Sequence, residues 1–408
     1  MNIFKSTVFS ILCALISIGA EAQWEEVAPF NFPGRHHPVT FSIDGYGYLM
    51  TGTASNGLRV RDMHRYDPVA DRWEEIESFP GEARSFSYAV VEDKKAYIGF
   101  GFSAGGFLLN DLWSFDPSTG DWERLADCPC PARTHPAFLA LNGKLYVAAG
   151  GASANLNDFW EYDIATDTWR ELPDFPSTTR HHPYHFTLHD KVYVGLGHGS
   201  QTINGEIIYR DFYAFDPTEE AWERIADIPG QGRVAGTQFS HNNKGYVLSG
   251  DGEDHWTIET GEFWQYDPDT DSWEQLPPHP GNSLWAPGSF VIDDTAYFMG
   301  GYHNNFASYP TDVWAFDLST LSTSTEDVAT ESDLQVFPNP ANDVITVSMQ
   351  NMGTGSSDLT ITNINGQVIH HIEQYDFSPI PLDQMPAGTY ILSLTHQKLR
   401  HHTTFIKL

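Results

Sequence analysis

The sequence predicts an all-β protein with two domains. The chain of 408 residues contains 34 Gly, 25 Pro, 12 Trp and 18 Tyr, a composition typical of many turns between aromatic-rich strands. A unit of about 50 residues recurs between residues 24 and 317, and a Ser/Thr-rich break separates it from a C-terminal run of short alternating segments. Repetition on that scale indicates a modular β architecture.

The charge balance excludes two classes of partner. With 54 Asp and Glu against 22 Lys and Arg, the formal net charge is −32. Attachment to nucleic acid or to an anionic membrane surface needs clustered cationic charge, so no nucleic-acid partner is predicted. A hydrophobic content of 40% is enough for packed cores.

Residues 1–22 have the pattern of a secretory signal peptide. One cation precedes an apolar run of about thirteen residues, which is too short to span a bilayer comfortably, and Ala20-Glu21-Ala22 has the small-x-small pattern of a cleavage site. We expect cleavage after Ala22, which leaves Gln23 as the first residue. No later stretch resembles a transmembrane helix, so none is predicted in the mature chain.

Residues 23–317 carry six copies of one repeat. Tryptophans recur with spacings of 49, 49, 47, 53 and 51 residues, at Trp24, Trp73, Trp122, Trp169, Trp222 and Trp273. Aromatic-Asp pairs recur in step with them, at Tyr66-Asp67, Phe115-Asp116, Tyr162-Asp163, Phe215-Asp216, Tyr266-Asp267 and Phe316-Asp317. Each unit also contains a Tyr-centred apolar run that ends in glycine. Four strand signals in such a period fit one blade of a β-propeller.

The phase of the repeat predicts a closed ring. Trp24 belongs to a fourth strand that appears before any first strand, while the sixth unit, which ends at Asp317, lacks a fourth strand of its own. The N-terminal strand is therefore expected to complete the last blade. This gives a six-bladed propeller whose aromatic residues are buried between blades.

The order of Arg, strand, Tyr, Gly-Gly, aromatic-Asp and Trp in each unit resembles the Kelch repeat, over about Trp24 to Asp317. Kelch propellers are mostly interaction scaffolds, so the resemblance implies a binding module, although a fold alone does not fix a function. Six-bladed bacterial Kelch proteins resembling N-acetylneuraminate epimerase interconvert sialic-acid anomers, which is the enzymatic alternative. Galactose oxidase-like propellers carry copper, but six predicted blades instead of seven and the lack of a Tyr-Cys cofactor context argue against oxidase chemistry.

Residues 318–332 have the composition of a flexible linker, because they are Ser/Thr-rich and lack aromatic and cationic residues. Residues 333–408 then contain short alternating runs separated by turn signals, which predicts a small Ig-like β-sandwich. Three of its motifs are Phe337-Pro338-Asn339-Pro340, Met385-Pro386-Ala387-Gly388-Thr389-Tyr390 and the final Phe405-Ile406-Lys407-Leu408.

These motifs resemble the type A C-terminal sorting domain of the type IX secretion system. The resemblance implies a Sec-dependent step into the periplasm and export across the outer membrane. The type IX machinery would recognise residues 333–408, and the protein would be secreted or attached to the outer cell surface.

One face of the predicted propeller, here called the loop face, carries the variable loops after the second strands and the entries to the innermost strands. Alignment on the repeat Tyr places five arginines at one position there, Arg35, Arg84, Arg133, Arg180 and Arg233. Three histidines follow two residues later, at His37, His135 and His182. In an acidic protein such a ring would form a positive mouth suited to a carboxylate, so all eight are ligand-binding candidates. The alternative is structural, because arginine belongs to the Kelch pattern and often hydrogen-bonds neighbouring loops.

A loop cluster adds three more ligand-binding candidates. Asp254, His255 and Trp256 combine an acidic group with an aromatic ring, which suits sugar binding or acid/base chemistry. A solvated acidic loop has the same composition and is the structural alternative.

Metal chemistry is a separate question. His37, His135 and His182 are competent ligands for zinc or copper, and two cysteines, Cys128 and Cys130, lie in the loop that leads to His135. These residues come from blades one, three and four, which need not bring them within the ligand distance of roughly 2 Å, so no metal and no cofactor is predicted. The two cysteines could instead pair in an oxidising compartment, although a bridge across one residue is strained.

Together these features predict an exported propeller that binds a carbohydrate or a surface protein through its loop face, as a monomer and without an identified catalytic residue. The alternative is a sugar-active enzyme, an isomerase or mutarotase on a sugar acid, because an arginine mouth would suit the carboxylate of N-acetylneuraminate. No Ser-His-Asp, paired-carboxylate or phosphate-loop pattern stands out.

Overall fold

The computed structural model describes residues 24–202, 205–258, 263–281, 283–321, 334–349, 357–363, 368–372, 375–383, 385–396 and 399–408. The expected signal peptide (1–22) with its cleavage site after Ala22 lies outside the described residues, as does most of the expected linker. The chain divides into two compact units, Met1–Leu318 and Ser319–Leu408. Among the described residues, no helix is long and apolar enough to cross a membrane.

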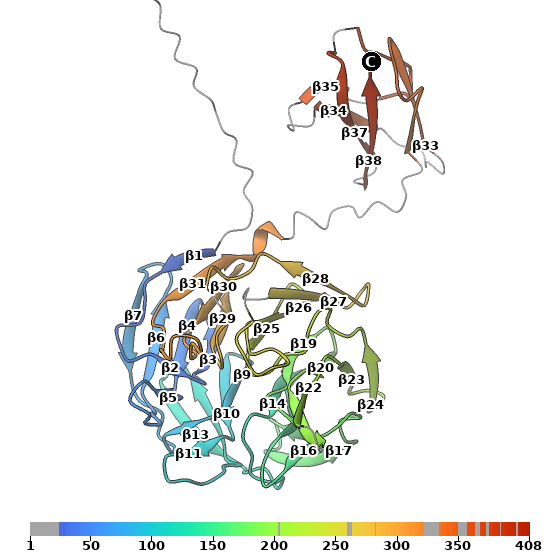
Figure 1. The fold of residues 1–408 in the computed structure, drawn as a ribbon. Coiled ribbons are helices and arrows are strands. Elements are labelled where there is room, and N and C mark those ends of the chain that lie inside the picture. The colour runs from blue at the N-terminus through green and yellow to red at the C-terminus, as the bar shows by residue number, and fades with distance from the viewer. Residues whose placement is uncertain are drawn as a thin grey trace, which may run out of the picture. The chain divides into compact units, whose positions relative to one another are not determined.

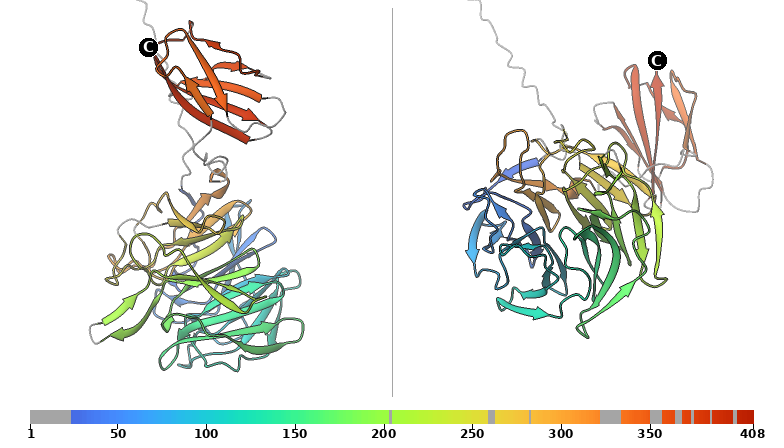
Figure 2. Two further views of the ribbon diagram at one scale, coloured as in Figure 1. Left: turned by 90° about the vertical axis from the view of Figure 1, so that its right-hand side faces the viewer. Right: turned by 60° about the horizontal axis from the view of Figure 1, so that its bottom comes forward.

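The first unit is a propeller of six antiparallel blades, each built from four strands, arranged around a central axis (Figures 1 and 2). Blade one comprises β3 (Val39–Ile43), β4 (Tyr46–Met50), β6 (Met63–Asp67) and β7 (Arg72–Ile76). Blade two comprises β9 (Tyr88–Glu92), β10 (Lys95–Gly99), β12 (Leu112–Asp116) and β13 (Asp121–Leu125). Blade three comprises β14 (Ala137–Leu141), β15 (Lys144–Gly151), β16 (Asn155–Asp163) and β17 (Thr168–Leu172). Blade four comprises β19 (Tyr184–Leu188), β20 (Lys191–Gly195), β23 (Phe212–Asp216) and β24 (Ala221–Ile225). Blade five comprises β25 (Thr237–His241), β26 (Lys244–Leu248), β27 (Phe263–Asp267) and β28 (Ser272–Leu276). Blade six comprises β29 (Gly288–Ile292), β30 (Thr295–Met299), β31 (Val313–Asp317) and β1 (Trp24–Val27).

The N-terminal strand closes the ring. In the last blade the strand order is β1-β31-β30-β29, and β1 runs antiparallel to β31 with Trp24 opposite Phe316 and Val27 opposite Val313. The innermost strands β3, β9, β14, β19, β25 and β29 contact one another in that order, and β29 returns to β3. One blade is therefore built from both ends of the propeller sequence, as the repeat phase predicts.

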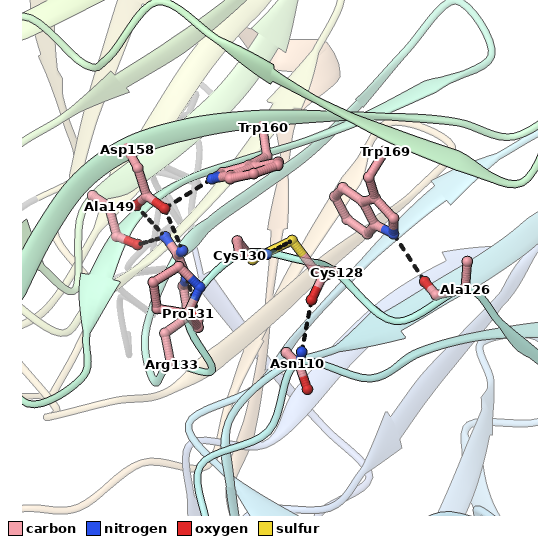
Figure 3. The surroundings of a disulfide bond; sticks show 10 residues. All are labelled: Asn110, Ala126, Cys128, Cys130, Pro131, Arg133, Ala149, Asp158, Trp160 and Trp169. Carbon is pink, nitrogen blue, oxygen red and sulfur yellow. Dashed lines mark hydrogen bonds and ion pairs between the residues drawn. A yellow bond between two sulfur atoms is a disulfide. The ribbon is translucent and has the colours of Figure 1, made fainter.

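Five of the six repeat tryptophans fasten neighbouring blades through a hydrogen bond, whereas the buried indole N–H of Trp122 has no partner among the described residues. The indole N–H of Trp73 donates to the carbonyl of Ala28 at 3.1 Å, and that of Trp169 donates to Ala126 at 2.8 Å (Figure 3). Trp24, Trp222 and Trp273 make the same kind of bond to Pro277, Pro173 and Ala226. A buried indole usually takes a partner for its N–H, and in these five units the position joins apolar burial to a fixed hydrogen bond.

Short strands extend the blades on the loop face. β2 (Arg35–His36) pairs with β5 (Thr53–Ala54), and β8 (Arg84–Ser85) pairs with β11 (Phe102–Ser103). In blade four, β18 (Arg180–His181) pairs with β21 (His198–Thr202), which pairs in turn with β22 (Gly205–Ile208). These strands set the height and spacing of the side chains that surround the axis.

The second unit begins with a short 3₁₀ turn, η1 (Leu318–Thr320), whose first residue still belongs to the propeller. Two antiparallel sheets follow. One holds β32 (Leu334–Phe337), β33 (Val344–Met349) and β36 (Ile380–Pro381), and the other holds β34 (Ser357–Asn363), β35 (Val368–Ile372), β37 (Gly388–His396) and β38 (Leu399–Lys407). Their buried faces share one apolar core that includes Ile345, Leu359 and Leu392, so this unit is a small β-sandwich with a core of its own.

Candidate functional site on the loop face

The five aligned arginines are buried inside the blades. Each has an exposed fraction of 0%: Arg35, Arg84, Arg133, Arg180 and Arg233. Four of them form bidentate ion pairs with a carboxylate on the third-strand side of the same blade, at Asp62, Asp111, Asp158 and Asp211 respectively. A guanidinium held in this way has its donors directed into the blade and away from the mouth.

Blade three shows the arrangement in detail (Figure 3). The two terminal nitrogens of Arg133 lie 2.7 and 2.6 Å from the carboxylate oxygens of Asp158, and the guanidinium also donates to the carbonyls of Ala149 and Pro131. The indole of Trp160 donates to the same carboxylate at 2.8 Å. Arg133 therefore ties the entry of the innermost strand to β15 and β16.

The cysteines that precede this arginine are joined to each other. Cys128 and Cys130 form a disulfide, and their side chains are 1% and 4% exposed. The Cys128 carbonyl accepts a hydrogen bond from Asn110 of blade two (Figure 3). A buried, bonded pair is a packing element, and it offers no thiolate to a metal.

The pKa values of the carboxylate partners agree with neutralisation of the arginine charge inside the blade. Burial favours the neutral form of Asp62, but hydrogen bonds from Arg35 and His64 outweigh it and hold the pKa of Asp62 well below its ordinary range. Burial acts against Arg180 in the same way at Asp211, whose pKa is also lowered.

The expectation of an open arginine mouth is therefore wrong for all five members, Arg35, Arg84, Arg133, Arg180 and Arg233. Side chains without exposed surface cannot bind a ligand, and four of them are already neutralised by a carboxylate. The structural alternative for this repeat position holds.

Two residues after each arginine position, the chain forms a ring around the axis, here called the axial ring. Its six members all have positive φ, between 50° and 65°: His37, Phe86, His135, His182, Ala235 and Ala286. Their backbones are linked from blade to blade, because the His37 amide donates to the Ala286 carbonyl at 2.8 Å and the His182 amide donates to His135 at 3.2 Å. The axial ring therefore brings residues of non-neighbouring blades close together at the propeller axis.

The three predicted histidines meet within the axial ring. Nε2 of His37 lies 3.0 Å from Nε2 of His182, and the rings of His135 and His182 have centroids 3.5 Å apart. Candidate ligand nitrogens of His37, His135 and His182 all lie within 4.8 Å of one another. The sequence argument that blades one, three and four need not bring these imidazoles together is corrected by this geometry.

The imidazoles of the ring are kept neutral by their surroundings. Burial is the main reason that the pKa values of His37, His135 and His182 lie well below the ordinary value, and neighbouring imidazoles lower them further. Burial also lowers the pKa of His36 to about 4 and that of His181 to about 3. All five imidazoles are therefore neutral at pH 7, and each has one unprotonated ring nitrogen.

Six backbone bridges surround the mouth next to the axial ring. They pair His36 with Thr53, Ser85 with Phe102, Thr134 with Gly151, His181 with His198, Val234 with Asp251, and Trp285 with Tyr302. The backbone pairing is the same in every blade, whereas the side chains differ. Such positions can set specificity without disturbing the fold.

Arg59 is a cation beside this mouth, where its backbone is bridged to Thr53. Its guanidinium lies 4.6 Å from the ring centroid of Phe102 and 5.8 Å from that of Phe86, and its charge contributes to the low pKa of His36. Among the described residues, the Arg59 side chain has neither an ion pair nor a hydrogen bond, and its Nε is buried without a partner. Aromatic faces hold the guanidinium in place while its terminal donors remain available.

Four loops of the loop face each present one exposed apolar side chain, and these four side chains are here called the apolar rim. They are Leu58 (63% exposed), Phe107 (70%), Trp256 (59%) and Phe306 (70%). Sequence reasoning identified only Trp256. The repeat contains the missing signal, because Leu58, Phe107 and Trp256 each stand ten residues after the tyrosine of the second strand.

The other two members of the predicted loop cluster also lie on the surface. Asp254 accepts a hydrogen bond from the Trp256 amide at 3.0 Å, and the His255 ring lies 5.2 Å from that of His198. The loop of blade five is thus placed beside the hairpin of blade four. Asp254 and His255 shape the presentation of Trp256 at the rim.

Asp251 is a buried carboxyl at the mouth. It is 5% exposed, and Asn304 of blade six donates to it at 3.0 Å. Burial raises the pKa of Asp251 to about 6, against the Asn304 hydrogen bond, with a further contribution from Asp254. A carboxyl that titrates near neutral pH can give and take a proton.

A cavity of about 500 Å³ lies along the axis of the propeller. It is lined by the innermost strands, and His37, His182, Ala235 and Ala286 of the axial ring contribute to its wall. The axial ring therefore separates the mouth on the loop face from the interior channel.

The closed ring of six blades, the buried arginine position and the separate C-terminal sandwich define a Kelch-type propeller with an appended sorting domain. The chain belongs to the Attractin/LZTR1 beta-propeller family, whose model matches residues 47–308. A model described as the secretion system C-terminal sorting domain matches residues 335–407. The protein is accordingly an exported propeller of the type IX secretion system, secreted or attached to the outer cell surface.

Two relatives show how far the similarity extends. N-acetylneuraminate epimerase from Yersinia enterocolitica is 30% identical over 106 residues, which is 24% of this chain and 27% of the epimerase, so the match spans about a quarter of that relative. The solved structure of YjhT is 19% identical, covers 62% of this chain and 87% of its own, and superposes with a TM-score of 0.54. The second similarity concerns the fold alone.

Proposed function

We propose that this protein is an exported glycan-binding module that takes an acidic sugar at the mouth of its loop face. The observation that supports this most strongly is Arg59, a cation held between Phe86 and Phe102 and without a protein counter-ion among the described residues. In a chain of net charge −32, a cation at such a place favours a ligand that brings its own negative charge.

The surroundings of Arg59 favour a sugar as the carrier of that charge. The ring of His36 lies 4.8 Å from Trp285 and 5.8 Å from Tyr309, so the mouth combines aromatic faces with polar edges. Sugar rings stack on aromatic faces through their C–H groups while their hydroxyls need donors and acceptors. The apolar rim extends the same surface outward, which suits a ligand of several sugar units.

A second candidate function is the interconversion of sugar-acid anomers. Two observations favour it: the partial match to N-acetylneuraminate epimerase, and the Asp251 carboxyl with a pKa of about 6 at the mouth. Arg59 would bind the carboxylate in both functions, and Asp251 would serve as the proton donor and acceptor only in the second.

Titration of the full mature chain with N-acetylneuraminate, observed by ligand NMR, tests the binding function. We expect binding to the parent protein and a loss of about tenfold or more in affinity for Arg59→Ala, because a charge-assisted contact is removed. Arg72→Ala is the matched control. Arg72 is the exposed first residue of β7 in the same blade, at the end of the blade opposite the loop face. The Arg72→Ala variant should bind the sugar as tightly as the parent protein does.

The same samples separate the two candidates. Anomer exchange at the rate of buffer alone, together with Arg59-dependent binding, supports a module that only binds. Exchange faster than buffer that is lost in Asp251→Asn supports the enzyme. Absence of binding to N-acetylneuraminate and to a panel of uronic-acid glycans would contradict both.

A further inference from the structure

Several ring nitrogens of the histidines in the axial ring lack a hydrogen-bond partner among the described residues. Both ring nitrogens of His135 and the Nδ1 of His182 are buried without a hydrogen-bond partner in the described part of the chain. Their side chains belong to residues that are 8% and 6% exposed. An unsatisfied buried polar atom destabilises the folded protein, so three such atoms at one place indicate a missing partner.

The fold itself does not require histidine at these positions. Phe86, Ala235 and Ala286 occupy the same repeat position with φ of 65°, 53° and 51°, close to the 50° of His37 and His135. Phenylalanine and alanine therefore satisfy the backbone of the axial ring equally well. What the histidines add is a set of three converging imidazoles.

The convergence has the dimensions of a ligand set. Three tetrahedral ligands at about 2.0–2.1 Å from one ion lie roughly 3.3 Å from each other. Nε2 of His37 and Nε2 of His182 are 3.0 Å apart, and His135 stacks against His182, with candidate nitrogens of all three within 4.8 Å. The ring centroid of His37 lies 5.0 Å from that of His135 and 5.3 Å from that of His182, whereas the close pair of His135 and His182 has to open, by rotation about the side-chain bonds, for all three imidazoles to point at one ion.

A contact with a neighbouring histidine, His36, orients the imidazole of His37. Nδ1 of His37 lies 2.6 Å from Nδ1 of His36. When His37 donates this proton to His36, its Nε2 keeps the lone pair that faces His182. Histidines that bind metals almost always donate their other ring proton in this way.

We propose that His37, His135 and His182 bind one divalent transition-metal ion of the zinc or copper class on the axis of the propeller. Three neutral imidazoles suit these ions, and a three-histidine set leaves one coordination position for water or a ligand. The cavity that His37 and His182 line gives that position access to the channel. The site is distinct from the Arg59 mouth and does not depend on the sugar-binding function.

Metal titration of the full mature chain, stripped with a chelator, tests the site. We expect one equivalent of Zn²⁺ by calorimetry and a rise in Tm, since an ion that binds only the folded state stabilises it. One equivalent of Co²⁺ should give visible absorption bands of four-coordinate geometry. His135→Phe and His37→Ala place the residues of blades two and five at the same repeat position, so both variants should fold, and each should weaken binding at least about a hundredfold.

His279→Phe is the matched control, because His279 is a buried histidine, 6% exposed, that packs against Trp24 and Phe298 in the last blade. It should bind metal like the parent. The C-terminal unit also carries histidines, such as His370 and His371, so the difference between variants is the readout.

Two results would overturn the proposal. The first is absence of a stoichiometric, histidine-dependent site in the parent protein, which would leave ordered water as the partner of these nitrogens. The second is retention of binding in His135→Phe with loss in His198→Ala. That pattern would place the ion in the neighbouring group of His181, His182 and His198, whose candidate nitrogens also lie within 4.8 Å of one another.

Discussion

Arg133 and Arg59 are both arginines of the loop face, and their surroundings give them opposite tasks. Arg133 has no exposed surface and meets Asp158 with two short bonds, so its charge stabilises the entry to an inner strand. Arg59 rests on aromatic rings without a counter-ion in the described part of the structure. Residue type alone therefore does not distinguish a scaffold residue from a ligand residue.

Replacing Arg133 with Met should destabilise the propeller by about 3 kcal/mol, because Asp158, whose side chain is only 19% exposed, would lose its counter-charge. Urea denaturation followed by tryptophan fluorescence measures this. The control is Arg124→Met, which breaks an ion pair with Asp127 whose arginine side chain is 56% exposed, and which should cost less than about 1 kcal/mol. Equal effects of the two substitutions would contradict the structural role of the buried arginines.

Asp251 predicts a pH-dependent gain in stability. Its folded-state pKa of about 6 lies above the ordinary 3.8, so the folded protein binds this proton more tightly than the unfolded chain. The resulting stabilisation is complete below pH 4 and is lost as the pH rises through 6. Asp251→Asn cannot ionise and should therefore be more stable than the parent at pH 7.5, by up to about 3 kcal/mol, which is several degrees in Tm.

Thermal unfolding at pH 4.0 and 7.5 measures this difference, which should vanish at the lower pH. Asp254→Asn, an exposed carboxyl of the same loop, serves as the control and should show no such gain. A Tm for Asp251→Asn that is below the parent value at both pH values would mean that the carboxyl group makes a stabilising contact that the amide cannot replace, whatever its protonation state.

Repeat alignment predicted where the important side chains sit along the chain, and it did so for the arginine and histidine positions alike. It could not predict that Asp62, Asp111, Asp158 and Asp211 would neutralise the arginines, because those carboxylates lie more than twenty residues away, across two strands. The meeting of His37, His135 and His182 depends on a ring of positive-φ residues, which no spacing in the sequence encodes.

At the scale of the strand and the blade, one position of the repeat alternates between tyrosine and phenylalanine from each blade to the next. The aromatic-Asp pair has Tyr in blades one, three and five and Phe in the other three. The Tyr162 hydroxyl donates to Asp167 at 2.6 Å, and the same carboxylate accepts the Ala126 amide of the preceding blade at 2.8 Å. Blades one and five repeat this arrangement through Asp71 and Asp271. The alternate blades are thus fastened to their neighbours by a tyrosine–aspartate pair.

Tyr162→Phe should therefore cost about 1 kcal/mol, the contribution of one hydrogen bond, without disturbing packing, because Phe occupies this position in the even blades. Chemical denaturation compares it with Tyr213→Phe, whose hydroxyl makes no hydrogen bond within the described residues. The control should be neutral. A neutral result for Tyr162→Phe as well would show that Asp167 holds the blades together through the backbone amide alone.

At the scale of the whole molecule, two units of different task share one chain. The sandwich has its own apolar core, and the family models match the two units separately, at residues 47–308 and 335–407. The repeat phase and the C-terminal motifs made this organisation predictable, since both are properties of the linear sequence. The composition of the mouth was not predictable in the same way, because its side chains come from loops in which the repeat is weakest.

Closure by β1 yields the last prediction. Trp24 packs against Phe263 and Phe316 with ring centroids 5.7 and 5.0 Å apart, and its indole donates to the Pro277 carbonyl at 3.2 Å. Removal of β1 exposes these contacts and the edge of β31, which together should cost about 5 kcal/mol, so a chain that starts at residue 28 should lose at least about 10 °C in Tm. A chain that ends at residue 321 should keep the Tm of the propeller, because the sandwich forms a separate compact unit. Calorimetry of both truncations beside the mature chain measures these effects. An unchanged Tm without β1, or a lower one without the sandwich, would contradict this division of the molecule.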